Sequence, residues 1–412
     1  MSSQEKRRPI LMIVHAYYEE DPRVRREAES LVAAGWEVDV IGLQHPGEPK
    51  NAVIEGVNLR RLPVRRRQGA GLHVYFGEYA KFLIRSMFAA TRAHLRRHYG
   101  MVQVHTLPDY LVFAALPLRL MRVPVLLDLH EAMPEFFRGR FARASNPISY
   151  RLLLLQERMA IGFTNELLTV NDALAERLLK RGAKANRLTV VLNSPDPRLF
   201  SPAAHPRRAF MADGVLKLVY AGAITPTYEL DVVLRAVAEM RHARRTLEVA
   251  VTLYGRGDAE GSLKELAREL QIAARVEMPG RIPINAVPGA IAAADIGIAA
   301  TRLDSYSEVS LSTKVLEYGA MGKPVAATRL PTVERYFGPD TLLLYEPGDS
   351  SSLAKAILHL VDDPADRESR VQRTAARVEE LGWAHQAEAY LAVVNRLAAR
   401  KSSKKEPPEA AG

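Results

Sequence analysis

Residues 307–330 read SEVSLSTKVLEYGAMGKPVAATRL and predict a short helix followed directly by a buried strand. Ser310 and Ser312 can cap the start of the helix, because their hydroxyl oxygens can accept bonds from free backbone N–H groups. Gly322, with a proline two residues later, ends the helix. The apolar run 324–328 then has the composition of a strand within an α/β sheet.

Three side chains of this helix, Lys314, Glu317 and Met321, recur at helical spacing and share one face. Such a face suits a phosphorylated, hydroxyl-rich ligand. The helix N-terminus and the ammonium favour phosphate, and the carboxylate can accept hydrogen bonds from two neighbouring hydroxyls. The alternative is a surface helix with a salt bridge between positions i and i+3, and the spacing alone favours that alternative.

The same alternation of strand and helix runs through the first half of the chain. The expected strands are 10–15, 37–43, 57–62, 101–105, 123–129, 167–170 and 188–192. The expected helices are 23–34, 74–98, 110–121, 147–162 and 172–181. Because most of these strands are almost continuously apolar, they predict a parallel sheet that is covered by helices.

A proline-rich segment, 194–208, interrupts the pattern, and the alternation then starts afresh. This predicts one domain over 1–200 and a second over 201–383, with a helix at 384–400 packing back on the first domain and a disordered tail at 401–412. The expected strands of the second domain are 216–221, 247–254, 274–278, 296–300, 325–328 and 341–345, and its helices are 231–244, 260–270, 285–294 and one from 351. Two open α/β sheets would place a ligand-binding cleft at the carboxyl ends of their strands.

Composition limits the class of protein. The chain has 412 residues and no cysteine, which excludes disulfides and thiolate chemistry and fits a reducing cytoplasm. The apolar run near the N-terminus is too short for a signal peptide, and no run approaches the ~18 apolar residues of a spanning helix. We therefore expect a cytoplasmic protein.

The net charge of +10 lies in the first half. Residues 1–200 hold 30 Lys and Arg against 20 Asp and Glu, whereas residues 201–412 hold 27 of each class. Residues 51–100 alone hold 10 basic against 2 acidic side chains, among them Arg60, Arg61, Arg65, Arg66 and Arg67. Together with helix 74–97, this region could contact anionic lipid at the inner face of the membrane. A solvated basic face is the alternative; no nucleic-acid-binding module is recognisable, so no nucleic-acid partner is expected.

Several segments resemble one enzyme family. STKVLEYGAMGKPVAA resembles the donor-binding segment of the family 4 glycosyltransferases, which are retaining enzymes with the GT-B fold. DPRVRREAESLVAAGWEVDVI, DLHEAMPE, LVYAGAI and DPADRESRVQR followed by Trp383 resemble other segments of that family in the same order. The resemblance implies two Rossmann-like, doubly wound α/β domains that face each other across a cleft. The first would bind the acceptor and the second the nucleotide-sugar donor.

The resemblance assigns donor-binding roles on the helix described above. Glu317 matches the second glutamate of the family's E-x7-E motif and would bind the ribose hydroxyls of the donor. The first glutamate falls on Val309, and Glu308 lies one residue earlier, so the motif is not intact. Leu311-Ser312-Thr313-Lys314 resembles an LPTK-like sequence of a subset of the family, and it would place Ser312, Thr313 and Lys314 by the donor diphosphate.

The phosphate contacts of the family are otherwise altered. Many members carry an Arg…Lys pair after the first strand of the second domain, whereas here Gly222 is followed by no basic residue. Gly222 and Thr225 can still offer backbone and hydroxyl donors, and Lys314 or Arg256 could supply the charge. Arg256 lies in a Gly-Arg-Gly turn that could equally serve only to reverse the chain.

The loop after the first strand also departs from the family, because it lacks the usual Gly-Gly turn. Arg23, in the first turn of the following helix, could supply positive charge to phosphate there. The alternative is that Asp21 caps this helix and Arg23 is solvated.

His130 directly follows a buried strand in the sequence Asp128-Leu-His130-Glu131. Its place at the carboxyl end of the strand predicts that it faces the cleft. The matching histidine of the family lies beside the reacting sugar, where it can hydrogen-bond the sugar and stabilise developing positive charge. Asp128 and Glu131 would orient His130 or take part with it in catalysis. A structural histidine is the alternative.

These features predict transfer of a sugar, with retention, from a nucleotide-diphosphate sugar to a hydroxyl of a glycan, a lipid-linked or another acceptor. Synthesis of bacterial cell-surface polysaccharide or glycolipid is the expected setting. No carboxylate nucleophile and no acidic metal-binding triplet are evident, so we expect no metal and no cofactor other than the donor itself. A nucleotide-sugar epimerase or phosphorylase on the same fold, or a degenerate nucleotide-sugar-binding protein, are the alternatives. A dehydrogenase is not expected, because no G-x-G-x-x-G follows the first strand.

Overall fold

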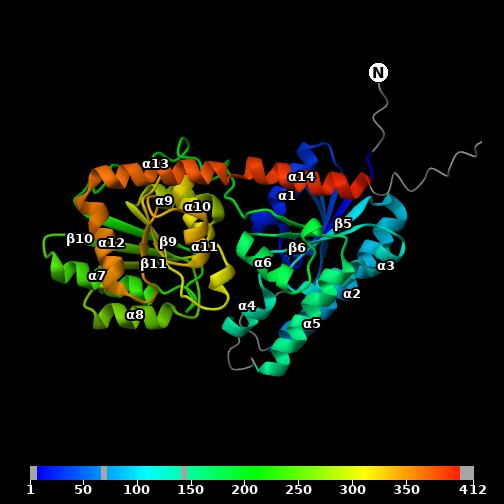
Figure 1. The fold of residues 1–412 in the computed structure, drawn as a ribbon, viewed down its shortest axis with the longest axis horizontal. Coiled ribbons are helices and arrows are strands. Elements are labelled where there is room, and N and C mark those ends of the chain that lie inside the picture. The colour runs from blue at the N-terminus through cyan, green and yellow to red at the C-terminus, as the bar shows by residue number, and fades with distance from the viewer. Residues whose placement is uncertain (1–6, 66–71, 141–145, 400–412) are drawn as a thin grey trace, which may run out of the picture. The chain divides into compact units, whose positions relative to one another are not determined.

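The computed structural model of the chain describes residues 7–65, 72–140 and 146–399 (Figure 1). These residues form two compact units. Unit 1 comprises the described part of 1–192 together with 386–399, and unit 2 comprises 193–385. Arg66, Arg67 and the expected tail at 401–412 lie outside the described residues.

Unit 1 is built on an eight-stranded sheet with the order β3-β4-β2-β1-β5-β6-β7-β8. The strands are β1 Ile10–Ile13, β2 Val38–Leu43, β3 Asn51–Ile54, β4 Val57–Leu62, β5 Met101–His105, β6 Val125–Leu129, β7 Glu166–Thr169 and β8 Leu188–Val190. All neighbouring strands are parallel except β3, which pairs antiparallel with β4. The central strands β1, β5 and β6 are wholly buried, as expected for strands covered on both faces.

Strand β3 was not expected from the sequence. This strand lies at the edge of the sheet, and its residues alternate between exposed and half-buried, so it lacks the apolar run of a central strand. The turn that joins it to β4 places both Glu55 and Gly56 at positive φ, 47° and 78°, which is the conformation of a tight hairpin turn. The sheet of unit 1 is therefore mixed and not purely parallel.

Helices cover this sheet on both faces. They are η1 Tyr18–Glu20, α1 Pro22–Ala33, α2 Leu72–Arg97, η2 Asp109–Ala115, α3 Leu116–Leu120, α4 Met133–Arg140, α5 Pro147–Phe163, α6 Asp172–Lys180 and η3 Ala185–Arg187. The helix expected at 110–121 is a 3-10 helix followed by one turn and a half of α-helix, with Pro117 at the start of the second piece. Helix α4 was not predicted.

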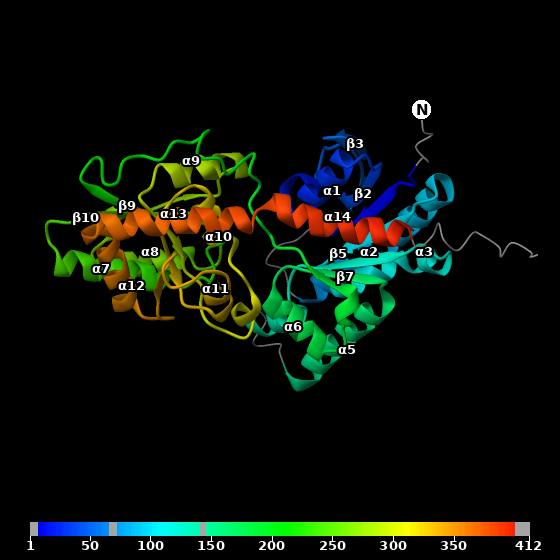
Figure 2. The ribbon, with the colours of Figure 1, turned by 45° about the horizontal axis from the view of Figure 1, so that its top comes forward.

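The C-terminal helix α14, Trp383–Ala399, runs along unit 1 in both Figure 1 and Figure 2. Tyr390 in this helix donates a 2.6 Å hydrogen bond to Gln103 of β5. Arg396 forms an ion pair of 3.3 Å with Glu166 of β7. The last residues of the chain that are described thus complete the first unit.

Unit 2 contains a six-stranded parallel sheet with the order β11-β10-β9-β12-β13-β14. Its strands are β9 Val215–Ala221, β10 Glu248–Tyr254, β11 Val276–Gly280, β12 Ile296–Ala299, β13 Val325–Thr328 and β14 Leu343–Tyr345. Its helices are α7 Leu230–Ala243, α8 Glu260–Glu269, η4 Ala273–Arg275, η5 Ile284–Ala286, α9 Val287–Ala292, η6 Ser307–Val309, α10 Thr313–Ala320, α11 Pro331–Tyr336, α12 Ser350–Asp362 and α13 Pro364–Glu380. Of these, α11 was not predicted.

The opening stretch of sequence forms η6, α10 and β13. The predicted serine caps are wrong in detail: Ser312 occupies the N-cap position, but its side chain makes no capping hydrogen bond, and Ser310 instead follows η6. Gly322 adopts φ +62°, so the predicted end of the helix is correct. No helix in the described part of the chain is long and apolar enough to cross a bilayer.

Candidate functional site

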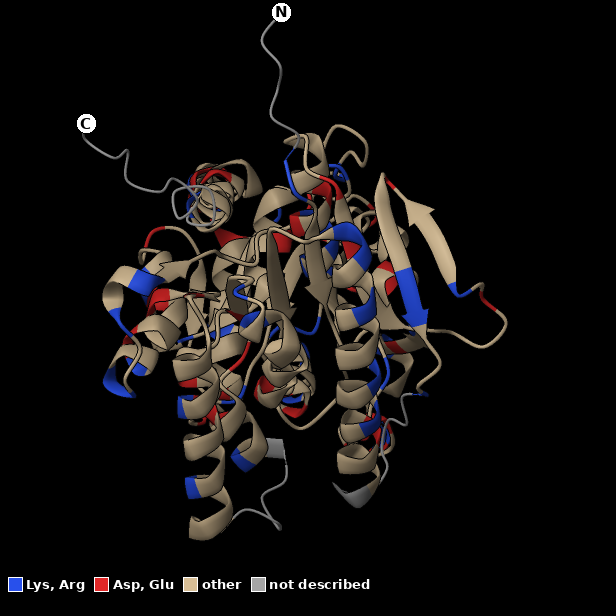
Figure 3. Ribbon diagram, turned by 90° about the vertical axis from the view of Figure 1, so that its right-hand side faces the viewer, with Lys and Arg blue, Asp and Glu red and all other residues tan. Residues whose placement is uncertain are grey.

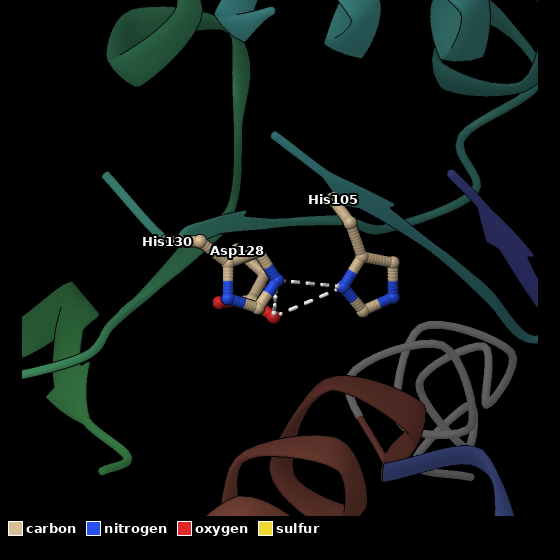
Figure 4. Close-up of side chains that lie close together, drawn as sticks. All are labelled: His105, Asp128 and His130. Atoms are coloured by element: carbon tan, nitrogen blue, oxygen red, sulfur yellow. Dashed lines mark hydrogen bonds and ion pairs between the residues drawn. The ribbon is translucent and has the colours of Figure 1, made fainter. Parts of the chain in front are cut away.

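Two histidines and an aspartate meet at the carboxyl ends of β5 and β6 (Figure 4). Parallel pairing places His105 directly opposite Asp128, and His130 follows β6. Asp128 Oδ2 lies 3.0 Å from His105 Nδ1 and 3.1 Å from His130 Nε2, and the two nitrogens are 3.3 Å apart. All three side chains are buried, so water cannot compete for these contacts.

The protonation states of this cluster follow from its surroundings. Burial by itself raises the pKa of Asp128, but contacts with His130 and His105 outweigh it and hold this pKa well below its usual value. Burial lowers the pKa of His130, which is therefore neutral at neutral pH. Because an ionised carboxylate only accepts hydrogen bonds, His130 donates Nε2–H to Asp128. Its Nδ1, which has no hydrogen-bond partner among the described residues, keeps a lone pair.

A second layer of buried polar groups supports Asp128, and the sequence analysis missed it. Burial is the main cause that raises the pKa of Glu27 in α1 well above its usual value, and the neighbouring Asp128 raises this pKa further. The acid therefore stays protonated and can donate a hydrogen bond to Asp128. Gln103 donates to Glu27 over 2.5 Å and accepts from Tyr390. The sequence signal for this buried polar layer was the presence of two polar residues, Gln103 and His105, within the otherwise apolar strand 101–105.

Replacing Glu27 by glutamine should change how stability depends on pH. The unfolded-state pKa of Glu27 is near 4.5 and the folded-state pKa is higher, so its stabilising contribution is complete below pH 4.5 and is lost as pH rises towards the folded-state value. Within that window the wild type should lose about 1.4 kcal/mol per pH unit relative to Glu27→Gln, whose amide still donates but does not titrate. Thermal unfolding of both proteins from pH 5 to 8 tests this. Parallel curves would show that Glu27 is ionised in the folded protein.

Arg23 and Asp21 form a pair at the start of α1. Asp21 caps the helix by accepting from the backbone N–H of Arg23, and the Arg23 guanidinium donates to both carboxylate oxygens over 3.1 and 3.0 Å. The prediction that Asp21 caps the helix is correct. The Arg23 side chain is 31% exposed, and its charge is paired with that of Asp21.

Arg23 and Glu131 lie on the wall of a cavity of about 250 Å³ in unit 1. The ends of β1 and β5 form one side of it, and α2, η2, α4 and α5 form the others. We call it the aromatic cavity, because most of its lining is apolar or aromatic: Val14, Ala16, Tyr75, Phe76, Tyr79, Leu107, Pro108, Tyr110, Met133, Phe136, Phe137 and Leu153, with polar His15, Asp21, Arg23, Thr106, Glu131 and Gln156.

In unit 2, Lys314 lies against Gly222 although the two are far apart in the sequence. The Lys314 ammonium is 4.2 Å from the ring centre of Tyr228 and 5.0 Å from that of Tyr220, at cation–π distance. A Cβ on Gly222 would lie 2.5 Å from Lys314 Cε, so a side chain there would displace the end of Lys314. The alternative of a surface helix is therefore wrong for Lys314, which is only 7% exposed and is held at the end of β9.

The Gly255-Arg256-Gly257 turn packs against the loop that contains Gly222 and Ile224. A Cβ on Gly255 would lie 1.8 Å from the carbonyl oxygen of Gly222, and one on Gly257 would lie 2.0 Å from that of Ile224. The glycines therefore allow two strand-end loops to pack backbone against backbone. The Arg256 side chain is 72% exposed, with a loose 3.7 Å contact to Glu260.

The remaining predicted donor residues lie on or near α10. Glu317 is half-buried one turn after Lys314, and Ser312, Thr313 and Thr225 are also half-buried. Glu308 is exposed in η6. Val309, which occupies the place of the first motif glutamate, is buried at 6% exposure, so that position is part of the packing of unit 2.

A buried glutamate that the sequence analysis missed ties the strand-end loops of unit 2 together. Glu229 Oε1 accepts from the Thr328 hydroxyl and Oε2 accepts from the backbone N–H of Gly348, both over 3.0 Å. The same hydroxyl oxygen of Thr328 accepts from the backbone N–H of Thr301. Burial raises the pKa of Glu229. This network fixes the loops after β9, β12 and β14 relative to one another.

Comparison with known families accounts for both units. The family model described as "Glycosyl transferases group 1" matches residues 216–363, and the model described as "Glycosyl transferase 4-like domain" matches residues 21–194. The chain belongs to the group 1 glycosyltransferases. The predicted family and enzyme class are thereby confirmed.

Individual relatives of this glycosyltransferase are distant. A D-inositol 3-phosphate glycosyltransferase of Kineococcus radiotolerans is 26% identical over 90% of this chain and 88% of its own. The sucrose-phosphate synthase of Thermosynechococcus elongatus matches with a TM-score of 0.76 at 18% identity, covering 95% of this chain and all of the other. HepE of Anabaena in complex with UDP-glucose matches with a TM-score of 0.67 at 13% identity, covering 96% of this chain and 99% of the other. These structures confirm the predicted GT-B fold.

The predicted basic cluster of this glycosyltransferase is not a continuous free surface. Arg61 is 6% exposed, donates to the carbonyl oxygen of Pro49, and pairs with Glu19 and Glu48. Within the cluster, Arg65 is exposed. Figure 3 shows Lys and Arg interspersed with Asp and Glu over several elements. Binding of anionic lipid through this cluster therefore loses part of its basis.

The expectation that this glycosyltransferase needs no metal stays a prediction. His105, Asp128 and His130 offer ligand atoms that all lie within 4.8 Å of one another. The same three atoms are already joined by the hydrogen bonds described above, which satisfy the carboxylate without a cation.

Proposed function

We propose that this protein transfers a sugar, with retention of anomeric configuration, from a nucleotide-diphosphate sugar bound by unit 2 to a hydroxyl of an acceptor bound by unit 1. The observation that carries the proposal is the position of Lys314, whose ammonium is lodged beside Gly222 at the end of β9 with Glu317 one turn further along α10. A positive charge, a close backbone approach and a carboxylate thus lie near one helix N-terminus.

Each part of this group suits one part of the donor. The Lys314 ammonium and the N-terminus of α10 favour the diphosphate. Gly222 lets the backbone approach the phosphate because no side chain intervenes. Glu317 can accept hydrogen bonds from two adjacent ribose hydroxyls. The complex of Anabaena HepE with UDP-glucose supports a nucleotide-diphosphate sugar as donor.

The chemistry that we propose relies on charge stabilisation. Departure of the diphosphate leaves negative charge, which Lys314 stabilises, and the lone pair of His130 Nδ1 accepts a hydrogen bond from a sugar hydroxyl. Asp128 is unsuited to act as a nucleophile because it is buried and accepts from two imidazoles. The acceptor hydroxyl would therefore attack from the face that the leaving group vacates. Catalysis without a metal ion is part of this proposal.

Replacing Glu317 by alanine should weaken donor binding by about 10- to 100-fold. The loss of hydrogen bonds to a charged carboxylate costs ~1.5–3 kcal/mol, which corresponds to that range. The measurement is the thermal shift produced by UDP-, GDP-, ADP- and dTDP-sugars in the wild type and in the variant. Glu265→Ala, an exposed position on α8, is the matched control and should behave as the wild type. The proposed donor site is wrong if none of these sugars stabilises the wild type.

A further inference from the structure

We propose that the acceptor is lipid-linked, and that its apolar chain occupies the aromatic cavity of unit 1 while α5 rests on an anionic membrane surface. The inference builds on the proposed function, in which unit 1 binds the acceptor, and it selects one acceptor class. Two observations carry it: the composition of the cavity and an exposed apolar ridge on the helix that forms one of its walls.

The lining of the aromatic cavity combines polar and apolar side chains. Arg23 and Glu131 lie near the strand ends, next to His130, whose backbone N–H donates to Thr106 over 3.1 Å. The walls also include Phe76 of α2 and Phe136 of α4. Half of the lining side chains, among them Met133, Phe137 and Leu153, offer no partner for the hydroxyls of a glycan, whereas a hydrocarbon chain needs none. The volume of about 250 Å³ lies just below the ~300 Å³ at which ligand pockets begin, which suits a segment of a chain.

Helix α5 exposes four large apolar side chains on one face. Ile148, Leu152, Leu155 and Met159 recur at i, i+4, i+7 and i+11 and are 71%, 60%, 54% and 55% exposed. We call these four residues the α5 ridge. Exposed arginines, Arg151 and Arg158, lie on the flank of this face.

An exposed apolar stripe flanked by basic side chains is the pattern of a helix that lies in a membrane interface. The apolar face enters the boundary of the acyl chains, and the guanidinium groups meet anionic head groups. This charge complementarity favours an anionic bilayer over a second protein as the occupant of the ridge.

The ridge and part of the cavity wall belong to the same helix, α5. Leu153 and Gln156 of α5 line the cavity, and they lie on a different face of the helix from the ridge. Phe76 of α2 also lines the cavity and is 58% exposed, so it lies at the mouth. A chain that leaves the bilayer beside α5 can therefore enter the cavity, with its head group towards the strand ends.

Binding of a lipid chain in the cavity can be measured directly. The probe is dioctanoylphosphatidylglycerol below its micellar concentration, with glycerol 3-phosphate as the chainless head group, and binding to the full chain is measured by titration calorimetry. We expect the lipid to bind and glycerol 3-phosphate not to, because each buried methylene contributes about fourfold in affinity. Leu153→Trp, which places an indole in the cavity, should weaken lipid binding at least tenfold. Leu154→Trp, at an equally half-buried position of α5 outside the cavity lining, should bind as the wild type.

The ridge is tested by flotation of the full chain with vesicles of phosphatidylcholine alone or mixed with phosphatidylglycerol. The wild type should float with the mixed vesicles, and Leu152→Ser/Leu155→Ser should lose at least tenfold in the bound fraction. Val53→Ser/Leu120→Ser removes two apolar side chains outside α5 that are at least as exposed, and it should float as the wild type.

The outcomes separate this inference from the proposed function. Equal lipid binding by Leu153→Trp and the wild type, binding of the chainless head group alone, or undiminished flotation of the ridge variant each overturn the inference. All variants should keep the thermal shift given by the nucleotide sugar that stabilises the wild type, which reports on unit 2. If no nucleotide sugar stabilises the wild type but lipid binding follows the expected pattern, the donor proposal fails and the lipid site stands.

Discussion

Sugar transfer should fall by ~10²–10³-fold when His130 is replaced by alanine, while binding of the nucleotide sugar stays unchanged. A hydrogen-bonding group that is held in place beside the reacting centre contributes that range to the rate. Asp128 fixes the orientation of the His130 ring through a 3.1 Å contact, so the group needs little reorganisation during the reaction. The alanine variant loses this group without touching unit 2. Steady-state transfer rates and nucleotide thermal shifts, measured on the same preparations, check both halves of this expectation.

The pH profile of the wild type supplies a second test of His130. Because burial lowers the pKa of His130 below 6.5, the neutral ring should persist as pH falls through 6.5, and transfer should decline only at lower pH. His98→Ala, a change at an exposed histidine of the same unit, is the matched control and should leave the rate unaltered. Full activity of His130→Ala would assign this histidine to structure alone.

Gly255→Ala should destabilise unit 2 by ~3 kcal/mol or more and abolish donor binding. The new Cβ would lie 1.8 Å from the carbonyl oxygen of Gly222, and the backbone of Gly255 has φ +151°, which side chains disfavour. Since Gly222 also contacts Lys314, displacement of its loop would move the proposed phosphate site. Thermal unfolding with and without a stabilising nucleotide sugar measures both effects.

Gly261→Ala provides the control for this prediction. Gly261 lies in α8, a Cβ there would meet nothing within 4 Å, and alanine is favoured in helices by ~1 kcal/mol over glycine. This variant should be as stable as the wild type or slightly more so. A Gly255→Ala protein with an unchanged melting temperature would mean that the two loops can separate without cost.

Much of the fold could be predicted from local pattern. The strands at 57–62 and 101–105 have the predicted bounds, and the parallel order follows from alternating strands and helices. The edge strand β3 and the helices α4 and α11 were missed. Strand β3 is half solvated, and helices α4 and α11 have only eight and six residues. Neither the strand nor the helices therefore show a strong apolar periodicity in the sequence.

The candidate sites were predicted less completely. Lys314 was named as one possible source of charge for the phosphate site at Gly222, but the direct contact of these two residues and the two tyrosine rings around the ammonium were not foreseen. The pairing of Arg23 with Asp21 was not foreseen, and the phosphate-binding role of Arg23 stays a prediction. These outcomes depend on which loops pack together, and loop packing leaves no period in the sequence.

The sequence by itself determined where strands and helices form, which family the chain resembles and which residues could carry charge to a ligand. These properties follow from apolar periodicity, turn residues and motif order, all of which act over a few residues. Only the tertiary structure decided which of these groups meet. Sheet register places His105 opposite Asp128, and the return of the C-terminal helix brings Tyr390 to Gln103 across 287 positions. Such contacts are set by the packing of whole elements, because a buried polar group must find its partner wherever the fold provides one.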